Sequence, residues 1–470
     1  MNIISKFKEV LVIKSNYFIS PLFWDKYLGN FAFEYAKKWA EINEYLPLET
    51  IEKIRWPRFK ELIKYARNNI PFYVEHWKKY STILDNIKFE DDLRYLPIVT
   101  RGNLKSFLAT GSNFIKNIPQ WRYYTETTSG STGEPLNFFF DNNYFIKNVV
   151  LGNRIWHWAE VDVLAPKLVC APLSAIRYYP NSTLLDPRAV RVKKYEYVEL
   201  IHSKKINLIF GSPIMTFDFL HSITEEKNNL TFKAAVLGGH AVSKGIRQYL
   251  KENFNCETFE FYASTESRMI SIECKEHDGL HIQEDGIIIE IVDEENRPLP
   301  PGKIGRVLIT TLDNWIMPLI RYQLGDIGVI LPKACKCGRT FRKMFVEGRT
   351  NEMLLLRPNG DSISPAELRD ILDKYFQYFE RYQLVQSNLK KFYFNIIPTS
   401  LYRNSIGVEA VQKIRSIIGK EASVTLNIKN KIPSLPNGKF KYFVSNLWQK
   451  KFPTELLHID DLKKRISGFT

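Results

Sequence analysis

The chain has few cysteines and no long apolar run, and both absences limit what kind of protein it is. Five cysteines, an odd number, occur among 470 residues, which argues against a secreted disulfide framework. Lysines interrupt every apolar run of the first stretch, MNIISKFKEVLVIKSNYFISPLFW, and this stretch lacks a small-residue cleavage site. Nowhere do about 18 apolar residues follow one another, so no transmembrane segment is expected. We therefore expect a cytoplasmic protein, with peripheral membrane association left open.

Acidic residues are outnumbered by basic ones, and internal repeats and low-complexity tracts are lacking. The formal net charge of +15 favours anionic partners such as nucleotides, nucleic acid, anionic lipid or acidic sugars. No basic stripe interleaved with aromatic residues is found, and no nucleic-acid-binding module, so nucleic acid is not an expected partner. An apolar content of 44% and an aromatic content of 14% suffice for a buried core, and the length predicts two or more domains.

The first hundred residues (1–100) are expected to form a helical region. Apolar side chains recur at three-to-four spacing, which places on one helix face Phe59, Leu62, Ile63 and Ala66. Pro71 suits the first turn of the next helix, and Thr100 suits an N-cap.

Strand patterns then divide the chain into two predicted domains. Short apolar runs that end in Gly, Ser or Pro alternate with helical patterns; they are KLVCAPL, INLIFGSP, FKAAVLGGH and CETFEFYAS. This alternation is typical of an α/β sheet whose strand ends carry a ligand site. Antiparallel strands are predicted from GIIIEIVDEENRPLPPGKIGRVLITTL onward.

Beyond a boundary near Gly348, a hairpin, helix, strand, helix and strand predict a small α+β domain that ends near the turn at Pro436 to Lys439. The predicted fold class is thus α/β. A large domain of mixed sheets and helices spans 1–347. A small α+β domain, to which the tail is also assigned, spans 348–470.

A loop of hydroxyl side chains and glycine separates two strand-like runs in YYTETTSGSTGEPLNFFFDN. It lacks the Gly-Lys-Ser/Thr ending of a Walker loop, and the LNFFF that follows predicts a strand instead of a helix. In such a hairpin, glycines let backbone amides approach an anion while the hydroxyls donate hydrogen bonds. An ordinary solvent-exposed turn is the alternative interpretation.

Four further motifs carry residues suited to a nucleotide. In FEFYASTES, Tyr262 can stack on a base and Glu266 can hold Mg²⁺, although a strand followed by a capped helix start would have the same pattern. Asp326, in RYQLGDIG, can accept both hydroxyls of a ribose or satisfy turn amides. Arg349 can donate to ribose or phosphate. Lys439, at a glycine turn, can neutralise a phosphate or remain solvated.

The order and spacing of the motifs TSGSTGEP, YASTES, RYQLGD, GRTNEML and NGK resemble the adenylate-forming superfamily of acyl-CoA synthetases and peptide-synthetase adenylation domains. Within it, NNIPFYVEHW, LRYLPIVTRGNLK and ECKEHDGLHIQEDGIIIEIVDEENRPLPPGKIGRVLITTL are similar to the phenylacetate–CoA ligase branch, which includes homologues from capsular-polysaccharide loci. The resemblance covers nearly the whole chain. It implies a large domain with an ATP site and a small domain that rotates about a hinge at Asn351.

The resemblance also assigns roles to residues. It implies that ATP is bound by Ser129, Gly130, Ser131, Thr132, Gly133, Gly238, Gly239, Tyr262, Asp326 and Arg349. Thr265 would touch the α-phosphate, Glu266 would hold Mg²⁺, and Lys439 would bridge the α-phosphate and the attacking carboxylate. The acid pocket is expected to be lined by Phe210, Gly211, Ser212, Pro213 and His240, although Ser212 and His240 also fit ordinary turn chemistry.

The cysteines form a separate candidate site. Cys335 and Cys337 offer two close thiolates, and Cys274 lies upstream with His277 and His281 nearby. Three thiolates and one imidazole make a tetrahedral Zn²⁺ site chemically plausible, and the resemblance favours His281 over His277. The zinc would be structural; reduced cysteines without a metal are the alternative. Cys170 is expected in the core.

The activity that the resemblance implies is ATP- and Mg²⁺-dependent activation of a small carboxylic acid as an acyl-adenylate, with release of pyrophosphate. The acyl group then passes to a thiol or amine acceptor, either coenzyme A or an amine. The second version gives an amide, on a sugar acid in surface-polysaccharide assembly. A catalytically silent scaffold is the alternative of another class, and the intact Glu266, Lys439 and hydroxyl loop speak against it.

Overall fold

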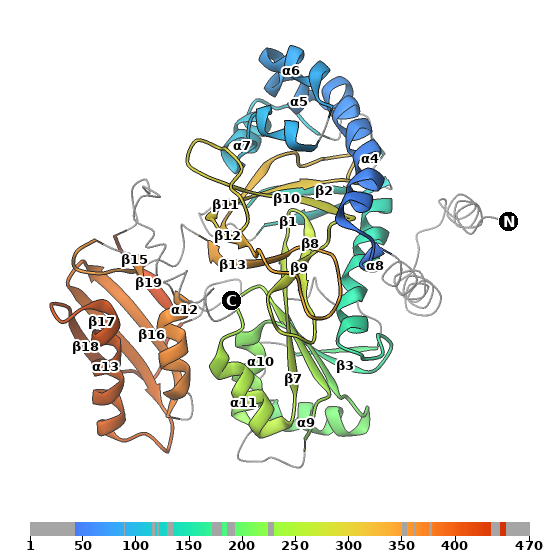
Figure 1. Cartoon of the computed structure of the whole chain (residues 1–470). Coiled ribbons are helices and arrows are strands. Elements are labelled where there is room, and N and C mark those ends of the chain that lie inside the picture. Colours follow the sequence, from blue (N-terminus) through green and yellow to red (C-terminus); the bar gives the residue numbers. More distant parts are fainter. Residues whose placement is uncertain are drawn as a thin grey trace.

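A computed structural model describes residues 43–88, 90–114, 118–119, 122–128, 135–171, 181–185, 193–223, 230–349, 355–360, 362–363, 365–375, 378–433 and 442–447. Figure 1 shows a large body that ends with β13, and a small body of sheet and helices beside it. Among the described residues, no helix combines the length and apolarity needed to cross a membrane.

Helices cover one end of the large body, as the sequence predicts. Helix α4 (Leu48–Asn69) buries the apolar face that contains Phe59 and Leu62, and α5 (Pro71–His76) begins at Pro71. Thr100 caps α7 (Arg101–Ala109) by accepting the backbone N–H of Asn103. Between them lie η2 (Lys78–Tyr80), α6 (Ser81–Asn86) and η3 (Glu90–Tyr95).

A mixed sheet of 11 strands forms the centre of the large body, in the order β10-β11-β12-β13-β9-β8-β7-β6-β5-β3-β4. Its parallel part contains β3 (Lys167–Cys170), β4 (Ser182–Leu184), β5 (Leu208–Gly211), β6 (Ala234–Gly238) and β7 (Glu257–Ser264). Its antiparallel part contains β8 (Arg268–Glu273), β9 (Leu280–Ile282), β10 (Ile287–Val292), β11 (Ile304–Thr311), β12 (Tyr322–Ile330) and β13 (Lys343–Arg349). All four predicted parallel strands and the antiparallel continuation are confirmed.

The parallel strands read as continuous apolar runs because helices cover both of their faces. Helix α8 (Asn142–Trp158) packs on one face, where Trp156 meets Val169 and Val236. Helices α9 (Lys194–Ser203), α10 (Pro213–Ser222) and α11 (Lys244–Phe254) pack on the other, where Cys170 is fully buried as predicted.

The strand-like runs around the hydroxyl loop form a hairpin of β1 (Tyr123–Thr127) and β2 (Asn137–Asp141), paired antiparallel. The strand predicted for LNFFF is therefore confirmed. Asp141 then accepts the backbone N–H of Tyr144 and caps α8. The loop residues 129–134 themselves lie outside the described residues.

The small body is an α+β unit, as predicted. A hairpin of β14 (Leu355–Leu356) and β15 (Ser362–Ile363) leads to α12 (Pro365–Leu372) and η7 (Asp373–Tyr375). A sheet in the order β18-β17-β16-β19 follows, built from β16 (Phe379–Asn388), β17 (Lys391–Pro398), β18 (Ser423–Ile428) and β19 (Phe443–Ser445), with α13 (Asn404–Ile418) before β18. Strand β19 lies beyond the turn at Pro436 to Lys439, before which the last strand of this unit was expected, and pairs parallel with β16; it falls within the span 348–470 assigned to the small domain. The predicted α/β fold class is confirmed.

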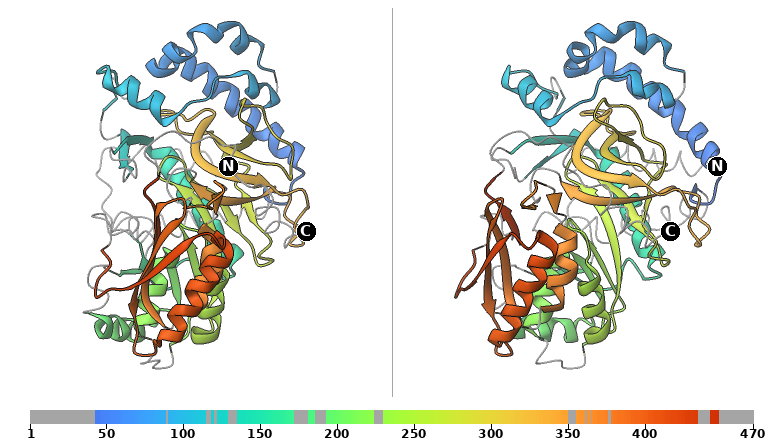
Figure 2. Two further views of the ribbon diagram at one scale, coloured as in Figure 1. Left: turned by 90° about the vertical axis from the view of Figure 1, so that its left-hand side faces the viewer. Right: turned by 60° about the vertical axis from the view of Figure 1, so that its left-hand side comes forward.

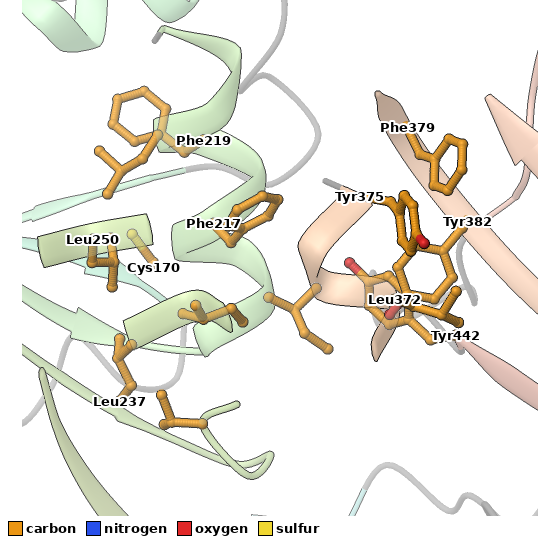
Figure 3. Close-up of a cluster of buried hydrophobic side chains, with 14 of the residues drawn as sticks. Cys170, Phe217, Phe219, Leu237, Leu250, Leu372, Tyr375, Phe379, Tyr382 and Tyr442 are labelled. Carbon is orange, nitrogen blue, oxygen red and sulfur yellow. The ribbon is translucent and has the colours of Figure 1, made fainter. Parts of the chain in front are cut away.

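One hydrophobic cluster joins the two bodies. Figure 2 shows the small body packed alongside the green segments of the large body, and Figure 3 shows the side chains at their meeting. The large body contributes Phe217, Phe219, Leu237 and Leu250. The small body contributes Leu372, Tyr375, Phe379, Tyr382 and Tyr442. Burial of this apolar surface holds the bodies in the arrangement of Figure 1.

Candidate nucleotide site and metal centre

The second and third motifs meet through a hydrogen bond between their two key side chains. The hydroxyl of Tyr262, near the end of β7, donates to Oδ2 of Asp326 in β12 at 2.6 Å. Strands β13, β9 and β8 lie between β12 and β7 in the sheet. The bond therefore brings together segments 64 residues apart. A ring that can stack on a base and a carboxylate that can accept ribose hydroxyls thus lie side by side.

The fourth motif lies beside the third through strand pairing. Asp326 and Arg349 are partners in the β12–β13 register. Arg349 is the last residue of β13, and its side chain lies outside the described part of the chain. Gly325, immediately before Asp326, has a φ of +87°, a conformation that glycine adopts without strain. The backbone of both motifs is thereby fixed at one place in the sheet.

The turn that carries Thr265 and Glu266 is held by hydrogen bonds at its end. The hydroxyl of Ser264 accepts the backbone N–H of Ser267 at 3.0 Å, and the hydroxyl of Tyr144 donates to the carbonyl of Ser267 at 2.8 Å. Glu266 is 3% exposed. A buried carboxylate on a fixed turn offers the hard oxygen ligands that Mg²⁺ prefers.

The β1–β2 hairpin is fastened to this turn. Arg268, two residues after Glu266, forms an ion pair with Glu126 of β1 at 2.9 Å, and its guanidinium lies 5.7 Å from the ring centre of Tyr124. The base of the loop is closed where the backbone N–H of Thr128 donates to the carbonyl of Leu136 at 3.0 Å. The described residues on either side of the hydroxyl loop are therefore part of a hairpin that is held beside the second motif.

Three predicted sites fall outside the described residues. They are the loop Ser129, Gly130, Ser131, Thr132 and Gly133, the hinge residue Asn351, and Lys439. Arg268 and Glu126, which the sequence analysis missed, lie at the edges of the first two motifs. Opposite charges flanking two motifs were a signal for this pair, but nothing in the sequence links residues 142 positions apart.

The residues expected to line the acid pocket lie at the carboxyl ends of adjacent parallel strands. Phe210 and Gly211 end β5, and Gly238 ends β6. A Cβ on Gly211 would lie 2.2 Å from the carbonyl oxygen of Cys170, and one on Gly238 would lie 2.6 Å from the ring of Phe261. Backbone therefore leaves no room for a side chain at Gly211, whereas a side chain at Gly238 would displace the ring of Phe261.

The turn after each of these strands carries the remaining predicted residues. Ser212 caps α10 by accepting the backbone N–H of Met215, and Pro213 occupies the first turn of that helix. Capping chemistry therefore accounts for both residues locally. Gly239, with a φ of +84°, and His240 follow β6. Because Gly238 pairs with Phe261, this turn lies next to Tyr262.

A second cluster contains four potential metal ligands. One donor atom from each of Cys274, His281, Cys335 and Cys337 lies within 4.8 Å of the others. The sulfurs of Cys274 and Cys335 are 3.6 Å apart, and the sulfur of Cys337 is 3.4 Å from Nε2 of His281. Zn–S bonds of about 2.3 Å and Zn–N bonds of about 2.0 Å in a tetrahedron require separations of roughly 3.8 and 3.5 Å. The donor set thus already has the spacing of a zinc site.

The surroundings of this cluster favour metal binding through Nε2 of His281. Nδ1 of His281 lies 2.8 Å from the carbonyl oxygen of Phe341, a bond that orients the ring and leaves Nε2 for a metal. Two hydrogen bonds hold the pKa of Cys337 far below that of an ordinary thiol; the bond from Cys274 contributes more than the bond from His281. His277 lies elsewhere, 3.3 Å from carboxylate oxygens of Glu257 and of Glu273.

Arg339, which is not one of the four potential ligands, supports the metal cluster with a positive charge. Nε of Arg339 lies 2.5 Å from a carboxylate oxygen of Glu44, and the guanidinium lies 4.5 Å from the ring centre of Trp158. Arg339 also hydrogen-bonds Cys337 through its side chain and through its backbone N–H. Positive charge beside a thiolate favours the form that binds metal.

Comparisons with known proteins can be set against this geometry. A family model described as the CapK C-terminal domain matches residues 355–446. Phenylacetate–coenzyme A ligase of Thermus thermophilus is 24% identical over 85% of this chain and 97% of its own length. Protein CapK of Staphylococcus aureus is 22% identical over 94% of this chain and 97% of its own length. The solved structure of 2-hydroxyisobutyryl-CoA ligase in complex with 2-HIB-AMP has a TM-score of 0.74, with 19% identity over 90% of this chain and 94% of that chain.

The predicted resemblance is confirmed. The chain has the fold of the adenylate-forming coenzyme A ligases, and its sequence is similar to phenylacetate–coenzyme A ligases and to CapK along most of its length. The small body is similar to the CapK C-terminal domain, whose match includes β19. That strand is an element that the sequence analysis did not predict.

Proposed function

We propose that this protein is an ATP- and Mg²⁺-dependent ligase that activates a carboxylic acid as an acyl-adenylate and then transfers the acyl group to an acceptor. The observation that carries the proposal is the bond between Tyr262 and Asp326, next to the turn of Glu266 and the base of the hydroxyl loop. Three of the motifs thus lie together although the chain separates them widely. Similarity in sequence to a phenylacetate–coenzyme A ligase and in fold to 2-hydroxyisobutyryl-CoA ligase also supports the proposal.

In the proposed site, each described residue has a role set by its position. Gly238, Gly239 and Tyr262 bind the adenine at the strand ends, and Asp326 accepts the ribose hydroxyls with Arg349 beside it. The amides and hydroxyls of residues 129–133 hold the β- and γ-phosphates, and Thr265 contacts the α-phosphate. Glu266 would hold Mg²⁺, which would supply positive charge to the phosphate oxygens.

The first step joins two anions, so catalysis consists mainly of alignment and charge neutralisation. A carboxylate oxygen attacks the α-phosphorus of ATP, the bond to the bridging oxygen breaks, and pyrophosphate leaves with the electron pair. We assign to Lys439 the role of offsetting the charge that accumulates where the carboxylate meets the α-phosphate. In the second step the acceptor attacks the acyl carbon, loses its proton, and AMP leaves.

Coenzyme A is the first acceptor we propose, because curated relatives along most of the chain are coenzyme A ligases. An amine that yields an amide with a sugar acid is the second. The match of the small body to the CapK C-terminal domain supports keeping this alternative. Zn²⁺ bound by Cys274, His281, Cys335 and Cys337 is proposed as a structural part of the large body.

The test is carboxylate-dependent exchange of labelled pyrophosphate into ATP, followed by AMP release with added acceptors. A panel of phenylacetate, 2-hydroxyisobutyrate, anthranilate and a hexuronic acid, crossed with coenzyme A and amines, covers both alternatives. Glu266→Gln should lose exchange, while Glu252→Gln, an exposed carboxylate on α11, should retain it. Absence of exchange with every acid, in protein that still binds ATP, would favour a silent scaffold.

A further inference from the structure

Tyr144 connects the start of helix α8 to the turn that carries Glu266. It is the third residue of the helix and is 4% exposed. Its hydroxyl donates to the carbonyl oxygen of Ser267 at 2.8 Å. Its own backbone is fixed, because its N–H donates to Oδ1 of Asp141, the N-cap of the helix, at 2.8 Å. A rigid donor therefore holds a carbonyl one residue beyond the proposed Mg²⁺ ligand.

Both peptide groups that follow Glu266 are held by side chains. The first, between Glu266 and Ser267, donates its N–H to the hydroxyl of Ser264 at 3.0 Å. The second, between Ser267 and Arg268, has its carbonyl oxygen bound by Tyr144. Two fixed peptide groups leave the backbone of Glu266 little freedom on this side. The direction in which its side chain leaves the turn is therefore set in part by these two hydroxyls.

The residue after this carbonyl has an unfavourable backbone conformation. Arg268 has a φ of +66°, a region that residues other than glycine rarely adopt. Its side chain is held by the ion pair with Glu126 at 2.9 Å and lies over the ring of Tyr124. The turn thus depends on side-chain contacts from outside it, and the bond from Tyr144 is one of them.

The hydroxyl of Tyr144 is not needed to fill space. Its ring stacks on that of Phe140, with centres 5.6 Å apart and planes 8° from parallel, and Phe140 stacks on Tyr124 at 5.1 Å. A ring without the hydroxyl would occupy the same place in this stack. A buried hydroxyl needs a hydrogen-bond partner, and the partner here is the turn of the proposed site. Satisfaction of a buried hydroxyl alone is the competing interpretation.

We propose that Tyr144 is a positioning residue for Mg²⁺: its hydroxyl holds the turn so that the carboxylate of Glu266 meets the ion that accompanies ATP. The inference rests on the proposed function, in which Glu266 binds this ion. Tyr144 acts through the backbone and contributes no ligand atom. Its loss should therefore weaken the binding of Mg²⁺ while the contacts to adenine and ribose remain.

The experiment measures Mg²⁺ dependence in the full-length protein. Tyr144→Phe and Ser264→Ala each remove one of the two hydroxyl contacts, and Tyr73→Phe is the matched control. Tyr73 is fully buried, and its hydroxyl likewise donates to a backbone carbonyl, that of Pro318 at 2.9 Å, and not to the turn of Glu266. Calorimetry measures ATP binding with and without Mg²⁺. Pyrophosphate exchange is followed across Mg²⁺ concentrations with whichever acid of the panel above is fastest, and thermal unfolding checks that each variant is folded.

We expect Tyr144→Phe and Ser264→Ala to raise the Mg²⁺ concentration for half-maximal exchange by about 10-fold, the scale of one hydrogen bond. Exchange at saturating Mg²⁺ should return to within about threefold of wild type, because the carboxylate is displaced and not removed. ATP affinity without Mg²⁺ should change by less than about twofold, whereas the gain in affinity on adding Mg²⁺ should fall by about 10-fold. Tyr73→Phe should lose stability but keep the Mg²⁺ dependence of the wild type.

Three results would overturn the inference while leaving the proposed function intact. They are a wild-type Mg²⁺ response in Tyr144→Phe, an equal shift in Tyr73→Phe, and a loss of ATP affinity in Tyr144→Phe that is the same with and without Mg²⁺. Wild-type protein that binds ATP more tightly with Mg²⁺ but exchanges no acid would reject the proposed ligase function, and calorimetry of Tyr144→Phe would still decide the inference. Wild-type affinity for ATP that does not depend on Mg²⁺ would reject both the role of Glu266 and this inference.

Discussion

Glu126 and Arg268 form an ion pair at 2.9 Å that joins the hairpin before the hydroxyl loop to the turn after Glu266. Both side chains are largely buried, with 14% and 17% of their surfaces exposed. The guanidinium also lies 5.5 Å from the ring centre of Phe140. Partial burial reduces solvent screening, so this pair is stronger than an exposed one. It fastens strand β1 to the turn that carries Glu266, the carboxylate proposed to hold Mg²⁺.

Glu126→Gln should lower kcat/KM for ATP by about 10-fold, which corresponds to about 1.4 kcal/mol of lost alignment. Initial rates of pyrophosphate exchange across ATP concentrations measure this. Arg297→Ala, which removes an exposed ion pair with Asp293, is the control and should behave as wild type. An unchanged kcat/KM in Glu126→Gln would mean that the hairpin is positioned without this pair.

The bond between Tyr262 and Asp326 predicts a specific response to the ribose. Asp326→Asn should raise the KM for ATP and should remove most of the preference for ATP over 2′-deoxy-ATP, because the carboxylate no longer accepts the hydroxyls. Tyr262→Phe keeps the ring, so it should lose less than about 10-fold, the scale of one hydrogen bond. Exchange rates for both nucleotides with each variant form the measurement. A preference for ATP that survives in Asp326→Asn would place the ribose elsewhere.

The Cys/His cluster predicts one zinc per chain in protein purified without added metal. Cys335→Ser should lose the metal and lower the thermal midpoint, because a structural zinc contributes directly to folding. Cys256→Ser is the matched control, since Cys256 is also buried but lies outside the cluster. Elemental analysis and thermal unfolding are the measurements. Metal-free wild-type protein with an unchanged midpoint after chelation would contradict the prediction.

Lys439→Ala should abolish adenylate formation yet retain transfer from a synthetic acyl-adenylate, because its charge is needed where the two anions meet. Lys431→Ala removes a lysine of the same small body outside the motif and serves as the control. The two half-reactions are measured separately with the same acid. Equal loss of both steps in Lys439→Ala would show that the lysine serves another purpose.

The sequence predicted the elements whose pattern is local. Parallel strands such as β5 and β6 are buried on both faces and so appear as unbroken apolar runs. Strand β16 was missed because FERYQLVQSN alternates with polar residues. One of them, Gln386, is fully buried, since its amide binds both the N–H and the carbonyl of Leu356 at 2.9 and 2.8 Å. Nothing local distinguishes such a glutamine from a surface one.

The candidate site likewise contains residues that the sequence predicted and residues that it did not. Motif order and family resemblance named Tyr262, Asp326 and the four residues of the metal cluster, which the structure brings into two groups. Tyr144 was not found, because the partner of its hydroxyl is a backbone carbonyl 123 residues away. Such a contact depends on how α8 packs against the sheet, and no pattern within either segment records that.

A half-buried carboxylate, that of Glu260, lies beside the proposed substrate turn after β6 and predicts a pH dependence of stability. The pKa of Glu260 is raised to about 7, mainly by desolvation; Arg247 opposes the rise and the nearby Glu273 contributes to it. Glu260 also accepts the backbone N–H of Val242, next to Ala241. A carboxyl whose pKa is higher in the folded than in the unfolded state binds its proton more tightly when folded. Its stabilising contribution is therefore full below about pH 4.5 and is lost as the pH rises through about 7.

Glu260→Gln, which imitates the protonated form, should flatten the fall in unfolding free energy between pH 5 and pH 8. The comparison is made by denaturant unfolding of both proteins at each pH. His277 also titrates in this neighbourhood, because Glu273 and Glu257 raise its pKa, so His277→Gln is measured as the second arm. One outcome is that the unfolding free energies of the wild type and of Glu260→Gln fall in parallel with pH, while that of His277→Gln falls less. The histidine, and not the carboxyl, would then control the pH dependence of stability. We expect the opposite result, in which Glu260→Gln flattens the pH dependence and His277→Gln does not. Arg247 and Glu273 face Glu260 directly, whereas His277 is partly exposed at the edge of this group of charged residues.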